Sequence, residues 1–230
     1  MKAIRCENLC KTFGSGNNAV HAVNGITAQF EPGTFYSIIG RSGSGKSTFL
    51  YLLSGILMPD QGEVYYGKYA LSQMKQRQLE RYRRRHTGFI FQDYRLLEEL
   101  TVKENILLPA VLDGKDPDME WCDAVMESLS ITDIANRFPF ELSGGQQQRT
   151  AIGRAIMNKP SCLFADEPTG NLDKKTGEAV LDFLLRIRDL YRPMILLVTH
   201  DLDIARSADV MLQIEDGRLV RNGYESRQNS

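Results

Sequence analysis

The stretch Gly40-Arg41-Ser42-Gly43-Ser44-Gly45-Lys46-Ser47 decides the fold of this 230-residue chain. An apolar run, Phe35 to Ile39, precedes it and is typical of a buried strand, and an apolar helix is expected from Lys46 to about Ser54. The spacing fits G-x-x-x-x-G-K-[ST], in which glycines let main-chain N–H groups turn inward around phosphate oxygens. Because the strand-loop-helix context is also present, the sequence predicts a phosphate-binding loop.

The side chains of this loop have distinct expected roles. Lys46 can reach the β- and γ-phosphates of a nucleotide, and the Ser47 hydroxyl can ligate Mg²⁺. The start of the following helix adds partial positive charge and free N–H donors. The residues predicted to bind the nucleotide here are Gly40, Arg41, Ser42, Gly43, Ser44, Gly45, Lys46, Ser47 and Thr48.

A second apolar run, Cys162 to Asp166, ends in an acidic pair. Asp166, at the end of a buried strand, is placed to hold Mg²⁺. Glu167 is a candidate to orient or deprotonate an attacking water. A solvated acidic pair is the alternative, and the phosphate-binding loop upstream makes it the weaker one.

The segment Leu142 to Arg149, LSGGQQQR, predicts the start of another helix. Ser143 and Gln146 have the spacing of a capping box. The two glycines between them leave N–H groups uncovered, so the segment is a second anion site that one nucleotide in one chain does not need. Ser143 is no nucleophile, since no histidine accompanies it in the sequence.

The rest of the pattern indicates an α/β fold with a mostly helical insertion. Short strands dominate up to about Gln92, helices dominate between about Asp93 and Asn158, and apolar strands then return. Expected strands are 3–9, 20–30, 35–39, 88–92, 162–166 and 195–199, with a hairpin turning at Asp216-Gly217. Expected helices are 46–54, 72–86, 102–112, 119–129, 144–157 and 174–190.

Composition excludes several classes of protein. The net charge of −1 gives no general affinity for nucleic acid, and 42% hydrophobic with 25% charged residues is ordinary globular composition. No apolar run is long enough to span a membrane, and the first residues lack a signal-peptide core. The cysteines at 6, 10, 122 and 162 are interpreted as reduced packing residues. A cytoplasmic protein is expected.

These motifs, in this order, resemble those of the ATP-binding-cassette (ABC) ATPases over essentially the whole chain. Gly40 to Ser47 resembles the Walker A loop, and Leu142 to Gln146 the ABC signature. Cys162 to Asp166 with Glu167 resembles Walker B and its catalytic glutamate. The remaining counterparts are Gln92 for the Q-loop, Asn171-Leu172-Asp173 for the D-loop and His200 for the switch histidine.

The resemblance implies a P-loop NTPase (RecA-like) core over 1–92 and 159–230, including an antiparallel β subdomain. A helical subdomain with the signature is implied over 93–158, all within a single ABC ATPase domain, 1–230. It further implies a head-to-tail homodimer that sandwiches two ATP molecules, each between one subunit's Walker A loop and its partner's signature.

On this resemblance, each site residue has an implied role. Catalysis is assigned to Glu167, His200, Gln92 and Lys46, and Mg²⁺ binding to Ser47, Gln92 and Asp166. Besides the loop, ATP contacts are assigned to Phe13, Ser143, Gly144, Gly145, Gln146 and Asp173. Phe13 stands where the family often stacks a tyrosine on adenine, and a role in the core or at a sheet edge is about equally supported.

Within the family, ADEPTGNLD and LSGGQQQR resemble the macrolide-efflux, lipoprotein-releasing and cell-division group. The stretch from Phe89 to Pro109 resembles ATPases of bacitracin- and lantibiotic-resistance transporters, whose separate permease has a large extracellular domain. This implies a location on the inner face of the membrane through that permease. The segment expected to contact the permease comprises Tyr94, Arg95, Leu96, Leu97 and Leu100; packing of its leucines inside the subdomain is the alternative.

Two further alternatives stay open. A regulatory ATPase that controls cell-wall hydrolases through its membrane partner, without transport, has the same catalytic motifs. A DNA-repair or translation ATPase is disfavoured, since the chain has neither long coiled coils nor a second cassette. The basic run from Lys75 to His86 suits either anionic lipid or, as the better interpretation, a solvated helix face.

Overall fold

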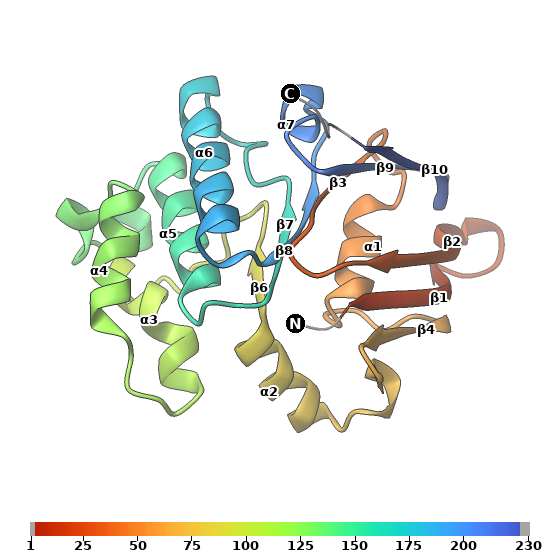
Figure 1. The fold of residues 1–230 in the computed structure, drawn as a ribbon, viewed down its shortest axis with the longest axis horizontal. Coiled ribbons are helices and arrows are strands. Elements are labelled where there is room, and N and C mark those ends of the chain that lie inside the picture. The colour runs from red at the N-terminus through yellow and green to blue at the C-terminus, as the bar shows by residue number, and fades with distance from the viewer. Residues whose placement is uncertain (1–2, 226–230) are drawn as a thin grey trace. The chain divides into compact units, whose positions relative to one another are not determined.

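The computed structural model describes residues 3–225 (Figure 1). The chain divides into two compact units. Unit 1 contains the chain up to Glu80 and again from Met194, and unit 2 contains Arg81–Pro193. The first unit therefore carries the phosphate-binding loop and His200. The second carries Gln92, the signature segment and the Asp166-Glu167 pair.

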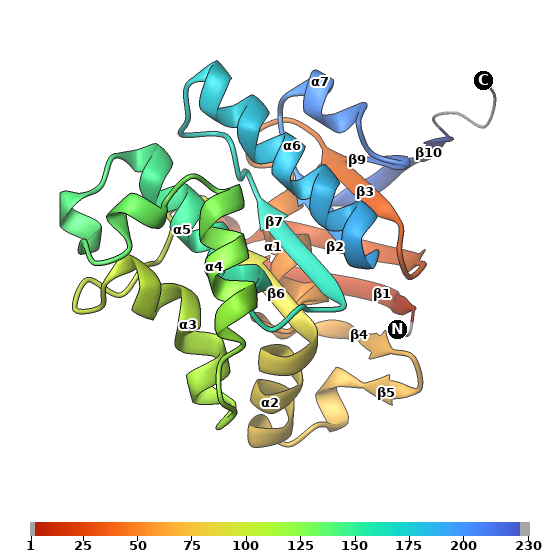
Figure 2. The same ribbon diagram turned by 60° about the vertical axis from the view of Figure 1, so that its left-hand side comes forward.

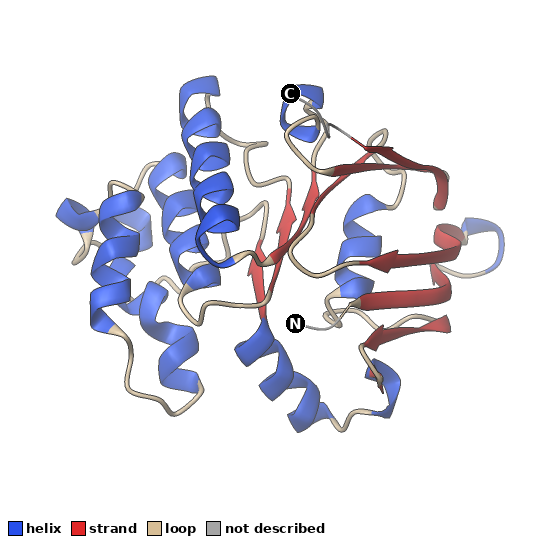
Figure 3. Ribbon diagram, in the orientation of Figure 1, coloured by secondary structure: helices blue, strands red, loops and turns tan. Residues whose placement is uncertain are grey.

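Unit 1 contains an antiparallel sheet with the strand order β2-β1-β4-β5. Its strands are β1 (Ile4–Phe13), β2 (Val20–Phe30), β4 (Gln61–Tyr66) and β5 (Tyr69–Ala70), and the sheet is drawn in red beside α1 in Figure 3. Ile4, Leu9 and Phe30 are buried. Within β2, Ile26 and Phe30 are buried whereas Thr27 and Gln29 are exposed, which is typical of a half-buried strand. The expected antiparallel β subdomain is confirmed.

The other strands of unit 1 surround the phosphate-binding loop. Strand β3 (Phe35–Ile39) pairs in parallel with β8 (Met194–Val198) and β9 (Val210–Glu215), and β9 forms a hairpin with β10 (Arg218–Glu225). Strand β8 is buried throughout, as a parallel strand covered on both faces requires. Helix α1 (Lys46–Leu53) follows the loop, and the short helix α7 (Leu202–Ala205) follows His200.

Unit 2 combines two parallel strands with helices. Strands β6 (Thr87–Ile90) and β7 (Cys162–Asp166) pair side by side. Its helices are α3 (Val102–Leu112), α4 (Met119–Ser128), α5 (Gly144–Ile156) and α6 (Lys174–Tyr191). Helices α3 and α4 both pack against α5, as Figure 2 also shows. The signature segment thus lies at the start of α5, the helix against which α3 and α4 pack.

Helix α2 (Gln76–His86) is shorter than the predicted helix 72–86. Residues Leu71–Gln73 form a 3₁₀ turn instead. The main-chain N–H of Lys75, just before the helix, donates to Gln78 Oε1 in its first turn. The basic run of α2 leads into β6, whereas Gln92 follows the other end of that strand. Arg85 at the end of the run forms an ion pair with Asp113 over 2.7 Å. No helix within residues 3–225 is both long and apolar enough to cross a membrane.

Candidate nucleotide-binding and hydrolysis site

The phosphate-binding loop encloses the ammonium group of Lys46. Its Nζ donates to the carbonyl oxygen of Gly40 over 2.9 Å and to that of Arg41 over 2.8 Å. Although it is charged, the residue is only 7% exposed. The main chain therefore keeps a cation inside the loop at the N-terminus of α1, where a phosphate would also meet the helix N–H groups.

Two glycines of the loop are required by close main-chain neighbours. Gly45 has φ of +98°, and a Cβ there would overlap the carbonyl oxygen of Ala22 in β2. A Cβ on Gly40 would overlap the carbonyl oxygen of Ile214 in β9. At Gly43 there is open space, which a bound phosphate chain could use. The loop is thus tight against the protein on one side and open on the other, so its shape fits a nucleotide phosphate chain.

Gly217, in the turn between β9 and β10, supports the same loop. Its amide donates to the Ser44 carbonyl over 3.0 Å, and its own carbonyl accepts from the Asn24 amide over 2.8 Å. The sequence pattern predicts only a hairpin turn here. No signal in the sequence relates this turn to residues so far upstream.

His200 lies at the same edge of the parallel strands as the loop. Ile38 pairs with Val198, and the Thr199 amide donates to the Ile38 carbonyl, so Gly40 and His200 follow the carboxyl ends of neighbouring strands. Ligands of α/β sheets bind at this edge. The histidine is exposed on the surface at this edge.

Phe13 lies at the end of β1 and pairs with Val20 in β2. Val20 is two residues before Ala22, the residue that lies against Gly45. The ring is 45% exposed, and Lys11 Nζ lies 5.9 Å from its centroid. Its place in the sheet that backs the loop is compatible with stacking on a base. The adenine contact itself stays a prediction.

The acidic pair lies in unit 2, where its two side chains differ in environment. Asp166 ends the fully buried strand β7 and is 2% exposed. Glu167 is half-buried and has φ of +48°, in the left-handed region that non-glycine residues rarely adopt. The Gly170 amide donates to the Glu167 carbonyl over 3.1 Å. A tight turn therefore begins at Glu167, directly after the end of β7.

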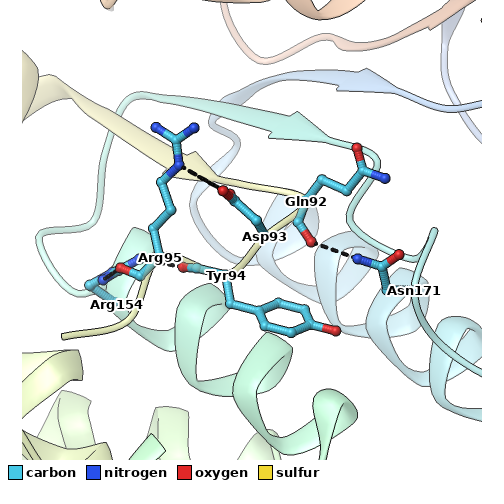
Figure 4. Close-up of polar contacts among 6 residues, drawn as sticks. All are labelled: Gln92, Asp93, Tyr94, Arg95, Arg154 and Asn171. Carbon is cyan, nitrogen blue, oxygen red and sulfur yellow. Dashed lines mark hydrogen bonds and ion pairs between the residues drawn. The ribbon is translucent and has the colours of Figure 1, made fainter. Parts of the chain in front are cut away.

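Gln92 follows β6 and is held through its main chain. Asn171 Nδ2 donates to the Gln92 carbonyl over 3.0 Å, and the Gln92 side chain points away from this contact (Figure 4). Tyr94 and Arg95, just beyond, both have positive φ, +60° and +49°. The predicted Q-loop and D-loop residues are thus brought together in unit 2.

Arg154 of α5 holds this left-handed turn, as Figure 4 shows. Its guanidinium donates to the carbonyl oxygens of Tyr94 over 2.7 Å and Arg95 over 2.5 Å. Burial lowers the pKa of Arg154 to about 10, so the group remains charged at neutral pH. Because both acceptors are main-chain atoms, side-chain patterns in the sequence did not reveal this contact.

The signature segment has the predicted capped helix start. Ser143 Oγ accepts from the Gln146 amide, and Gln146 Oε1 accepts from the Ser143 amide over 2.9 Å. Ser143 and Gly144 are exposed. A Cβ on Gly144 would lie 3.0 Å from the Tyr94 hydroxyl, and one on Gly145 would lie 3.1 Å from Thr176 Cγ2. The two glycines thus let the Tyr94 and Thr176 side chains lie close to the helix N-terminus.

Thr176 connects the signature to the predicted D-loop. Its hydroxyl donates to Asp173 over 2.7 Å, and its amide donates to the same carboxylate over 3.0 Å. The hydrogen bond from the hydroxyl has the larger effect and that from the amide the smaller, and together they hold the pKa of the Asp173 carboxyl below its usual range. Asp173 is thereby the N-cap of α6, ionised at neutral pH.

Gln148, which the sequence-based site did not include, is 1% exposed. Its Nε2 donates to the carbonyl oxygen of Pro168, next to Glu167, over 2.7 Å. Gln148 lies four residues before Ile152 on the apolar stripe of α5. A polar residue on an apolar stripe was the signal that could have identified it.

The donor set suits a metal held mainly by phosphates rather than by the protein. Among residues 3–225, no cluster of three or more His, Cys, Asp or Glu side chains could hold a metal ion. The predicted metal ligands include one carboxylate, that of Asp166. Mg²⁺ is bound through one or two carboxylates plus substrate phosphates in such sites, so the residues fit Mg²⁺ that arrives with a nucleotide.

Comparison with known proteins agrees with this geometry. Residues 23–170 match the family model described as ABC transporter. The lipoprotein-releasing system ATP-binding protein LolD of Xanthomonas euvesicatoria is 39% identical over 218 residues, covering 94% of this chain and 89% of LolD. The bacitracin export ATP-binding protein BceA of Halalkalibacterium halodurans is also 39% identical, covering 99% of this chain and 92% of BceA.

Solved structures agree as well. The dimeric ATP-binding cassette MJ0796, in a post-hydrolysis state with ADP and Pi, matches with a TM-score of 0.91 and 33% identity, over 98% of this chain and all (100%) of that one. The α/β fold of a P-loop NTPase cassette is confirmed. The chain therefore belongs to the ABC transporter family and is an ATP-binding, ATP-hydrolysing subunit of a transporter.

Proposed function

We propose that this chain hydrolyses Mg²⁺-ATP as a head-to-tail homodimer, in which each signature loop completes the partner's nucleotide site. The observation that carries the proposal is the capped, exposed helix N-terminus at Ser143 and Gly144, a second anion site besides the phosphate-binding loop. A helix N-terminus favours a phosphate by its partial positive charge and its free N–H groups. The related cassette MJ0796 is dimeric in its solved structures, which supports a dimer here.

In this proposal, the chain's own residues divide the work on ATP. The loop from Gly40 to Thr48 binds the phosphates, and Lys46 contributes a positive charge. Ser47, Asp166 and Gln92 would hold Mg²⁺, which supplies charge neutralisation on the phosphate oxygens. Glu167 orients the attacking water, and His200 donates a hydrogen bond to the γ-phosphate. Phe13 would stack on adenine, while Gln146 and Asp173 would line the partner-facing side.

The membrane partner is proposed to be a separate permease with a large extracellular domain, which holds the chain at the inner face of the membrane. Relatives named for lipoprotein release and for bacitracin export support a substrate that is a lipid-linked molecule or an antimicrobial peptide. The segment from Tyr94 to Leu100 is proposed as the contact with this permease.

The dimer is tested with Glu167→Gln, which keeps the side chain's shape and removes its negative charge. We expect this variant to bind ATP and to accumulate as a dimer in size-exclusion chromatography, with hydrolysis stalled. Wild-type turnover in the variant would refute the role of Glu167, and a monomer at saturating ATP would refute the sandwich. The partner is tested by co-purification with the permease and by ATPase assays with bacitracin and with a lipoprotein.

A further inference from the structure

We propose that helix α5 couples the two ATP sites of the dimer, with Gln148 and Arg154 as positioning residues. They tie the signature loop, which touches the partner's nucleotide, to Glu167 and to the Gln92 loop, which act on the chain's own nucleotide. This inference rests on the proposed head-to-tail dimer. Every contact that carries it lies inside unit 2.

The first tie joins α5 to the turn of the catalytic glutamate. Gln148 Nε2 donates to the Pro168 carbonyl over 2.7 Å, and both residues are buried. Glu167, the residue before, holds a left-handed conformation with φ of +48°. A strained conformation at a functional site persists only where its surroundings fix it. The hydrogen bond from Gln148 fixes the carbonyl of Pro168, one peptide beyond Glu167, and thereby limits movement of the turn that carries the Glu167 carboxylate.

The second tie joins α5 to the loop after Gln92. Arg154 donates to two consecutive carbonyl oxygens, those of Tyr94 and Arg95, and both of these residues also have positive φ. From this anchor, the Tyr94 side chain reaches back to the signature, where its hydroxyl lies beside Gly144. A shift of Gly144 or of the whole helix therefore reaches Tyr94 at two points.

The two ties close into a circuit. Asn171, three residues after Pro168, donates to the Gln92 carbonyl over 3.0 Å, as Figure 4 shows. One path thus runs from α5 through Gln148 to Pro168 and Asn171. The other runs from α5 through Arg154 to the Gln92 loop, and the Asn171 bond joins them. A movement of the helix therefore reaches the turn after Glu167 and the loop after Gln92, because buried or charged hydrogen bonds hold Pro168, Tyr94 and Arg95 to α5.

The geometry has a consequence for hydrolysis. The N-terminus of α5 is occupied when the partner's ATP is in place, and the anchored residues then serve the other ATP. Binding of ATP at one site therefore affects the position of the reactive groups at the second site. The expected signature is cooperative hydrolysis, with a Hill coefficient above 1 that depends on Gln148 and Arg154.

The test substitution is Gln148→Met, which keeps the length of the side chain and removes the donor to Pro168. The matched control is Gln147→Met; Gln147 donates to the carbonyls of Pro139 and Leu142 and not to the Glu167 turn. The full-length chain is assayed for ATP turnover at varied ATP concentration and for binding of a fluorescent ATP analogue, with thermal unfolding measured in parallel.

For Gln148→Met we expect kcat to fall roughly tenfold or more, as for a misplaced catalytic group. Affinity for the ATP analogue should stay within about twofold, and the Hill coefficient should fall to about 1. The Tm should change by less than about 4 °C, since the variant loses one hydrogen bond but also removes the buried Gln148 Oε1, which has no partner among residues 3–225.

Unchanged kcat and Hill coefficient in a wild-type-like fold would overturn the inference, as would an equal loss of kcat in Gln147→Met. If Gln148→Met does not fold, Arg154→Lys is the second test. It keeps the charge but cannot hold two carbonyls in the same fixed fork, so the same loss of kcat at retained ATP affinity is expected. Should the wild-type chain hydrolyse no ATP at all, the proposed function fails instead, and that outcome is distinct from the others.

Discussion

The side-chain amide of Asn171 donates to the main-chain oxygen of Gln92 over 3.0 Å, which joins two loops far apart in the sequence. In Asn171→Asp, a carboxylate replaces the donor and faces the carbonyl oxygen. We expect kcat to fall several-fold, because the Gln92 loop loses its anchor, while ATP affinity is retained. The measurement is steady-state ATPase activity together with equilibrium binding.

Asn158→Asp is a matched control for this variant. Asn158 also donates an amide proton to a main-chain oxygen, that of Arg84, over 2.9 Å. Arg84 is not one of the predicted site residues. A similar loss of kcat in both variants would show that the effect of Asn171 is general and not local.

Gly45→Ala should destabilise the protein and abolish ATP binding. The added Cβ would overlap the Ala22 carbonyl, and an alanine at φ of +98° is also strained. In Gly43→Ala the added Cβ lies in open space. This variant is therefore destabilised only by the left-handed conformation of its backbone, by about 1–2 kcal/mol. Urea unfolding compares the two variants. Equal losses would mean that the contact with β2 adds nothing.

Lys46→Ala should lose affinity for ATP by at least tenfold, since charge-assisted hydrogen bonds to phosphate are removed. In the same variant, the carbonyls of Gly40 and Arg41 also lose their partner. Binding is measured on the monomer with a fluorescent ATP analogue. Unchanged affinity would refute the phosphate-binding assignment of this loop.

Gly144→Asp should abolish hydrolysis and leave ATP affinity of the monomer near normal. The carboxylate would repel the partner's γ-phosphate, and its Cβ would lie 3.0 Å from the Tyr94 hydroxyl. Ser143→Ala separates the cap from the charge effect: it should cost about 1 kcal/mol of stability through the lost cap. If monomer affinity falls with hydrolysis in Gly144→Asp, the loop acts on the chain's own nucleotide.

Asp173 gives a prediction on pH. Hydrogen bonds from Thr176 hold the pKa of the Asp173 carboxyl below the usual range, so this pKa is lower in the folded protein than in the unfolded chain. The cap therefore contributes stability above the unfolded pKa, about 3.9, and loses it as the pH falls through the folded pKa. In Asp173→Asn, the asparagine side chain can still cap α6 but has no titratable group. Unfolding measured from pH 7 down to pH 3 should show a smaller loss of stability in Asp173→Asn than in the wild type.

Much of the fold was predictable because its elements have strong local signals. The helix at Val102–Leu112 and the strands at Val20–Phe30 and Phe35–Ile39 have the predicted bounds, since hydrophobic period and turn residues agree there. The start of α2 was wrong by four residues. A 3₁₀ turn stabilised by tertiary contacts occupies that stretch, and the local pattern is silent on such contacts.

The candidate site was predictable where side chains carry the chemistry. Lys46, Ser143 and Asp166 follow from residue types at fixed spacing. Gly217, Arg154 and Gln148 were not found, because their partners are the main-chain atoms of Ser44, Tyr94 and Pro168. Any residue could supply such a carbonyl, so no pattern of residue types marks it.

The contact between Gly217 and Ser44 bears on the order in which the chain becomes competent. During synthesis, the whole phosphate-binding motif leaves the ribosome well before the turn that supports it, because Gly217 lies far downstream of Ser44 in the sequence. A nascent chain that has not yet reached Gly217 carries every catalytic motif but lacks the main-chain partner of Ser44. ATP binding by this protein is therefore expected to begin only after the hairpin of β9 and β10 has folded.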